Sequence, residues 1–104
     1  MTQQPLTTFM KPVQEGIGYI KDGHYEQGLE KMKPFIKMME EAKTLPIQIF
    51  YYYAVAQFKS GDVEGFMSTY ELMKMQEAAN GAEEKMKADL DAWFEALLNG
   101  LNEQ

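Results

Sequence analysis

The chain has 104 residues, of which 45% are hydrophobic and 25% charged, values typical of one soluble globular domain and not of a disordered segment. The formal net charge is −6 and all ten basic residues are lysines, so nucleic acids and anionic membrane surfaces are poor partners for it. Because the chain contains no cysteine, disulfide frameworks, thiolate zinc sites and thiol nucleophiles are excluded.

Five helical segments are expected in chain order, because Gly- and Asp-containing turn signals divide the chain into stretches with helical periodicity. In the second stretch, apolar residues recur at steps of three and four, as they do on one face of a helix. The third contains an aromatic run, Ile49 to Tyr53, which continues to Phe58 without a turn residue and therefore predicts a buried helix and not a strand. The expected segments are approximately residues 9–21, 25–43, 46–59, 62–79 and 83–98.

Single residues refine the expected helix boundaries. Pro34 lies inside the second helix and predicts a kink near residues 30–34, because proline has no N–H to donate to the carbonyl four positions back. Asp62 is a good N-cap for the fourth helix, and Gly100 is the expected stop of the fifth.

Small and aromatic residues recur at fixed offsets. In a helical hairpin, Gly16 and Gly28 would allow close approach of two helices, Tyr19 would fill the gap between them, and Gly23 would form the turn. The first unit comprises Gly16, Tyr19, Gly23, Tyr25, Gly28, Met32 and Phe35. In the same register, the second comprises Ala54, Gln57, Gly61, Val63, Phe66, Tyr70 and Met73.

This pattern resembles the tetratricopeptide repeat, a pair of antiparallel helices with small and aromatic residues at fixed positions. The resemblance covers residues 9–79; the second unit departs from the pattern at Gln57, where an aromatic is usual, and at Phe66, where a small residue is usual. The turn glycines Gly23 and Gly61 are 38 positions apart, about one helical turn more than the family's usual spacing of about 34. The resemblance implies one all-α domain, a right-handed superhelical stack of hairpin 9–43, hairpin 46–79 and a capping helix 83–98.

In this family, the first helix of each hairpin lines a concave groove that holds the partner. The groove implied here is apolar and aromatic and has a lysine at the end of each helix, so it suits an amphipathic helix or apolar peptide segment. Its residues are Met10, Val13, Ile17, Ile20, Lys21, Gln48, Tyr51, Tyr52, Val55, Phe58 and Lys59. A second interpretation stays open, in which these side chains are core residues covered by the fifth helix or by a second copy of the chain.

The leading functional hypothesis is a cytoplasmic protein- or peptide-binding module: an adaptor, a chaperone or a peptide-responsive regulator. The alternative is a structural, self-assembling protein that forms a homodimer through apolar residues of its last helix: Trp93, Phe94, Leu97, Leu98 and Leu101. An enzyme is not expected, because the single histidine, His24, lies in a turn without a serine or cysteine nucleophile beside it. We expect no metal or cofactor, because the carboxylates lack metal-ligand spacing and no phosphate-binding loop is present.

Overall fold

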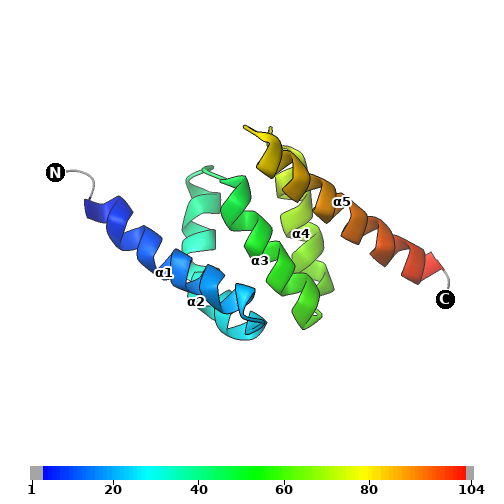
Figure 1. Ribbon diagram of the computed structural model, residues 1–104, viewed down its shortest axis with the longest axis horizontal. Helices are drawn as coiled ribbons and strands as arrows, with labels where there is room; N and C mark the ends of the chain where they lie inside the picture. The colour runs from blue at the N-terminus through cyan, green and yellow to red at the C-terminus, as the bar shows by residue number, and fades with distance from the viewer. Residues whose placement is uncertain (1–3, 103–104) are drawn as a thin grey trace.

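The computed structural model describes residues 4–102, with the side chains of residues 11–100. These residues form five helices and no strand (Figure 1). The helices are α1 (Gln4–Lys21), α2 (Tyr25–Glu41), α3 (Ile47–Ser60), α4 (Val63–Lys74) and α5 (Gly81–Asn102). The expected all-α fold of about five helices is confirmed.

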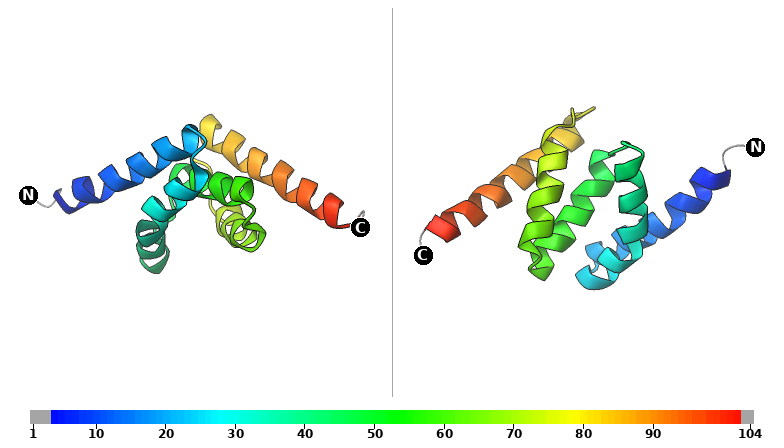
Figure 2. Two further views of the ribbon diagram at one scale, coloured as in Figure 1. Left: turned by 90° about the horizontal axis from the view of Figure 1, so that it is seen from below. Right: turned by 180° about the vertical axis from the view of Figure 1, so that it is seen from behind.

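The helices lie in two layers, with α1, α3 and α5 in one and α2 and α4 in the other (Figures 1 and 2). Helices α1 and α2 pack against each other as a hairpin, and so do α3 and α4. Helix α3 contacts each of the other four helices, and α5 packs on α3 and α4. Residues of α3 therefore decide both how the core is filled and what the middle of the first layer presents to solvent.

The hydrophobic core lies between the layers and receives side chains from every helix. Its largest fully buried members are Phe50, Phe66, Met32, Met73, Leu90 and Val13. Each such side chain stabilises the folded state by about 1.5–3 kcal/mol relative to leaving it in water. The core methionines fill irregular gaps between the helices, as a flexible thioether does.

Two glycines bring α1 and α2 together. A Cβ atom on Gly16 would lie 2.4 Å from Cγ of Met32, and one on Gly28 would lie 2.9 Å from the carbonyl oxygen of Gly16. Real Cβ atoms do not approach other atoms so closely, so these positions require glycine at this helix separation. The close approach expected from the first repeat unit is confirmed.

Three helices end with the same backbone motif. Gly23 and Gly61 both have φ of +88°, and Lys43 has φ of +58°, in the left-handed region that favours glycine. In each case the amide of the following residue donates to the carbonyl five positions back, at 2.8–2.9 Å. The two turn glycines therefore act as expected, whereas Lys43 adopts the same conformation with a side chain.

The connection between α4 and α5 differs from the sequence prediction. Helix α4 ends at Lys74 and not near residue 79, because residues 75–80 form a turn and an irregular connection whose last two residues cap the next helix. The Asn80 side chain accepts a hydrogen bond from the Glu83 backbone amide at 2.9 Å, and the Glu83 carboxylate accepts one from the Ala79 backbone amide at 2.9 Å. This reciprocal cap fixes the start of α5 at Gly81.

Two other boundary expectations have different outcomes. The helix stop predicted at Gly100 is wrong, because α5 continues through it to Asn102 without a positive φ at that glycine. Helix α2 runs without interruption through Pro34, which is exposed, and the kink expected there stays a prediction.

Candidate functional site

The side chains of α3 divide into faces according to helical spacing. Phe50, Ala54 and Gln57 point into the core and are buried. Four other residues, at steps of four, three and four, share one side of the helix. They are Gln48, Tyr52, Val55 and Lys59, and we call them the α3 stripe. Gln48 and Lys59 are exposed, whereas Tyr52 and Val55 are half-buried and pack partly against the core.

Helix α5 occupies the neighbouring side of α3. The Trp93 ring stacks on Phe58, with centroids 5.1 Å apart, and on Tyr51, with centroids 6.4 Å apart. The Tyr51 hydroxyl donates to an Asp89 carboxylate oxygen at 3.1 Å. Burial, and then this hydrogen bond to a carboxylate, raise the pKa of Tyr51 to about 12. Tyr51 and Phe58 therefore use much of their surface to hold α5.

The aromatic contacts continue into α4 and anchor α5 from a second side. The ring centroids of Phe58 and Phe66 are 5.2 Å apart, and the Tyr70 ring stacks on Phe94 with centroids 4.3 Å apart. The Tyr70 hydroxyl donates to Asp91 at 2.6 Å, and this bond, together with burial, raises the pKa of Tyr70 to about 12. Each aromatic pair contributes about 0.5–1.5 kcal/mol beyond area burial. Helix α5 is thus attached to both α3 and α4 by rings and by a charged hydrogen bond.

Helix α1 borders the stripe on its other side through one contact that the structure defines. The Lys21 ammonium lies 5.3 Å from the centroid of the Tyr52 ring, a cation–π contact, and the Tyr51 ring meets Tyr52 edge to face at 5.2 Å. At the start of the stripe, the Gln48 amide donates to Glu83 of α5 at 3.4 Å. The α3 stripe thus lies between α1 and α5.

Two residues expected in the groove lie elsewhere. Val13 is 1% exposed and Ile20 is 3% exposed, and both belong to the core. They share the side of α1 that carries Gly16, the side that packs against α2, so a partner in the groove cannot reach them. Ile17, half-buried, and Lys21, exposed, lie on a different side of α1. Met10 lies outside the residues whose side chains are described.

Part of the site could not be assigned from the family register. Trp93 and Asp89 of α5 contact Tyr51, but the family register assigns no groove positions to the last helix. The available signal is the apolar periodicity of α5, which is compatible both with a helix that covers α3 and with a homodimer interface; in the structure Trp93 and Phe94 stack on rings of α3 and α4. The six residues of the expected groove that remain accessible and are not stacked on α5 are Ile17, Lys21, Gln48, Tyr52, Val55 and Lys59.

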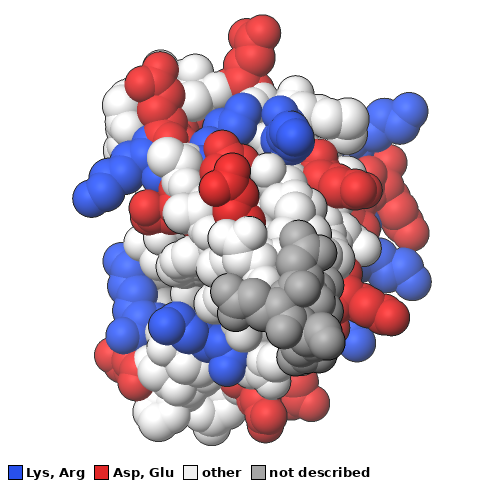
Figure 3. Space-filling model, turned by 90° about the vertical axis from the view of Figure 1, so that its right-hand side faces the viewer, with Lys and Arg blue, Asp and Glu red and all other residues white. Residues whose placement is uncertain are grey.

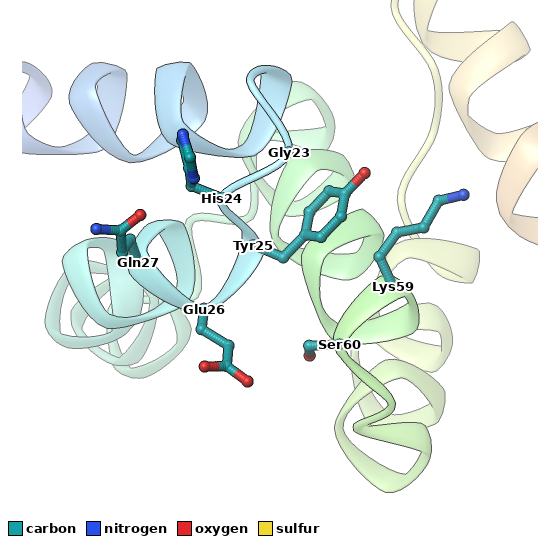
Figure 4. Close-up of a pocket in the computed structure, with 7 residues that line it drawn as sticks. All are labelled: Gly23, His24, Tyr25, Glu26, Gln27, Lys59 and Ser60. Atoms are coloured by element: carbon teal, nitrogen blue, oxygen red, sulfur yellow. The ribbon is translucent and has the colours of Figure 1, made fainter.

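A shallow, open depression of about 500 Å³ lies where the α1–α2 turn meets the end of α3 (Figure 4). It is lined by Gly23, His24, Tyr25, Glu26, Gln27, Lys59 and Ser60. In Figure 4, His24 points away from Tyr25 and Lys59, and Glu26 points away from the Lys59 ammonium. The Ser60 hydroxyl donates to the Gln57 carbonyl at 3.2 Å. These side chains diverge and do not form a nucleophile–base pair.

Over the described side chains, no group of three or more His, Asp or Glu residues is placed to hold a metal ion. Among the same residues, none of the helices combines the length and the apolar character that spanning a bilayer requires. Comparison with protein-family models, with curated proteins and with solved structures gave no match. The resemblance to tetratricopeptide repeats therefore rests on the chain's own close-approach and turn glycines.

Proposed function

We propose that this chain is a protein- or peptide-binding module of tetratricopeptide-like architecture: an adaptor, a chaperone or a peptide-responsive regulator. The partner segment lies along the α3 stripe, between α1 and α5. One observation carries the proposal: on the central helix of the first layer, Tyr52 and Val55 are only half-buried, although α1 and α5 border them on both sides.

The chemistry of the stripe suits an apolar or amphipathic segment. Tyrosine supplies a large contact area with few rotatable bonds, and aromatic residues dominate the binding energy of protein interfaces. Apolar area that a partner removes from water contributes about 25 cal/mol per Å² before the costs of association. The stripe spans twelve residues of helix from Gln48 to Lys59, or about 16 Å at 1.5 Å per step, which is enough for two to three turns of a partner helix.

The proposal is tested by capture of binding partners from cell extract on the immobilised chain and on two variants. Tyr52→Ala removes the central ring of the stripe. Tyr19→Ala is the matched control. Tyr19 is a tyrosine of α1, in the same layer as α3; it is 39% exposed, and its ring contacts His24 and not a ring of the stripe. We expect the control to capture the same proteins as the unaltered chain and Tyr52→Ala to capture them at least about tenfold less, the loss typical of an aromatic hot spot.

Circular dichroism and the thermal midpoint establish that both variants remain folded. Equal capture by Tyr52→Ala would contradict the proposal. A loss of capture that follows unfolding would place Tyr52 among the structural residues instead.

The runner-up is a homodimer through α5, now restricted to fewer residues. Trp93 and Phe94 are stacked against α3 and α4 and are not free to pair two chains. Leu98, near the end of α5, is 39% exposed, and Leu101 lies outside the described side chains. The C-terminal part of α5 extends beyond the other helices (Figure 1). On this side of the molecule, acidic and basic side chains are interspersed with uncharged ones (Figure 3). If the dimer exists, sedimentation at micromolar concentration will report twice the mass of one chain, and Leu98→Glu will lower it.

A further inference from the structure

The α3 stripe has opposite charges near its two ends. Its first residue, Gln48, contacts the Glu83 carboxylate, and its last residue is Lys59. Lys21 adds a second ammonium group above the Tyr52 ring. Lys21 and Lys59 both occupy the last turns of their helices, α1 and α3, which point in the same general direction in Figure 1. The stripe therefore has ammonium groups over Tyr52 and at Lys59, and a carboxylate beside Gln48.

Neither lysine is paired with a carboxylate of the described residues. Among the described side chains, neither has a carboxylate oxygen within 4.0 Å of its ammonium nitrogen, whereas Lys31 pairs with Glu15 at 3.0 Å. Two acidic residues are nearby: Asp22 follows Lys21 in the sequence, and Glu26 lines the same depression as Lys59. In Figure 4 the Glu26 carboxylate points away from the Lys59 ammonium.

Tyr25 adds a hydrogen-bonding group at this end. It lines the depression beside Lys59, and its hydroxyl points to the same side as the Lys59 ammonium (Figure 4). One ammonium group over Tyr52 and, at the Lys59 end, a second ammonium group with a hydroxyl thus flank the apolar stripe. A carboxylate fits such an arrangement, because hydrogen bonds between charged partners are stronger than neutral ones.

We propose that the partner is an acidic peptide: its apolar side chains cover Tyr52 and Val55, and carboxylates at one end bind Lys21 and Lys59. This inference rests on the proposed function and adds the chemistry of the partner. The attraction is local, because the chain as a whole carries a charge of −6 and charges more than about 8 Å apart are largely screened at physiological salt. The lysines therefore select among apolar segments and do not steer them from a distance.

The experiment measures the affinities of three fluorescein-labelled peptides by fluorescence anisotropy. All three share an amphipathic core of about twelve residues with leucines on one face, and they differ in two flanking residues at one end, which are Glu, Gln or Lys. A charge-reversed variant, Lys21→Glu with Lys59→Glu, is compared with a matched control, Lys33→Glu with Lys37→Glu. The control changes the net charge by the same amount at two exposed positions of α2, in the other layer.

We expect the unaltered chain and the control to bind the Glu peptide about three- to tenfold more tightly than the Gln peptide, with a difference that shrinks as salt is added. The charge-reversed variant should reverse this order and bind the Lys peptide best. If the three peptides bind the unaltered chain equally well, the acidic-partner inference is wrong while the groove itself stands. If none of them binds, both the groove and this inference fail. If the control reverses the order as well, net charge and not these two lysines sets the preference, which also overturns the inference.

Discussion

Substituting alanine for each of two glycines in α1 should change stability in opposite directions. A Cβ atom added at Gly18 meets no atom within 4 Å. A Cβ atom added at Gly16 lies 2.4 Å from Cγ of Met32 and 3.3 Å from the carbonyl oxygen of Gly28. The Met32 side chain is fully buried, so it has no free space into which it can move. The two positions belong to the same helix and differ only in what faces them.

The magnitudes follow from two opposing effects. Alanine in a helix interior is favoured over glycine by about 0.5–1 kcal/mol, so Gly18→Ala should raise the free energy of unfolding by that amount. Gly16→Ala gains the same helix propensity but overfills the core, which typically costs about 1–3 kcal/mol. The two variants should therefore differ by about 1–3 kcal/mol, with Gly16→Ala the less stable.

Urea denaturation followed by circular dichroism at 222 nm measures both variants, and thermal melts provide an independent check. For a domain of this size, each kcal/mol shifts the thermal midpoint by about 4–8 °C. Equal denaturant slopes would show that the denatured states are comparable. If Gly16→Ala proved as stable as Gly18→Ala, helices α1 and α2 would not approach each other as closely as described, and the first hairpin would have a different geometry.

Three further predictions concern hydrogen bonds, a turn and pH. Thr69→Val should destabilise the chain by about 1–3 kcal/mol, because the buried Gln57 oxygen loses its donor at 2.7 Å, and in chemical denaturation the added Gln57→Met change should recover most of that loss. Lys43→Gly should raise the free energy of unfolding by about 1 kcal/mol, and with it the thermal midpoint, because glycine adopts the left-handed φ of +58° without strain. An unchanged or lower midpoint would count against this. Folding raises the pKa of Tyr51 and of Tyr70 from 10.0 to about 12, so the unfolded chain loses these two protons at lower pH than the folded chain does. The free energy of unfolding should therefore be undiminished below pH 10 and should fall as the pH rises from 10 to 12. In thermal melts over this pH range, the variant with phenylalanine at both positions should show a shallower fall.

Most of the helical framework was predictable, because it depends on local signals. Turn glycines, the Asp62 cap and three- and four-residue periodicity each act over one or two helical turns, and the structure contains the helices they predict. The Asp62 carboxylate accepts the Gly65 amide at 3.0 Å, as an N-cap does. Errors arose where distant contacts decide the outcome, as at the end of α4, where the Lys87 ammonium of α5 donates to the Gln76 carbonyl.

The departures of the second unit from the repeat pattern are explained by contacts inside the second hairpin. Gln57, at a position where an aromatic is usual, is buried and accepts a hydrogen bond from Thr69. Phe66, at a position where a small residue is usual, is fully buried beside Phe58. Each substitution is compatible only with the other residues around it, and single-position patterns carry no information about such pairs.

The candidate site was predictable only in part. Helical spacing alone places Tyr52, Val55 and Lys59 on one side of α3, and the structure agrees. Spacing does not say which neighbouring helix covers which side, so the family register predicts Val13 and Ile20 in the groove, whereas the structure packs them against α2. The orientation of α1 depends on the glycine contact with α2, and that contact is a property of the pair of helices and not of either one.

The most direct test of the central claim is to map the binding surface on the isotopically labelled chain by NMR. Amide chemical shifts are recorded while the apolar helical peptide with the acidic flank is added. The largest changes should fall on Ile17, Lys21, Gln48, Tyr52, Val55 and Lys59, while amides of α2 and α4 that face away from this layer change little. Changes concentrated on α2 or α4, or on the exposed part of α5 alone, would contradict a binding groove along α3.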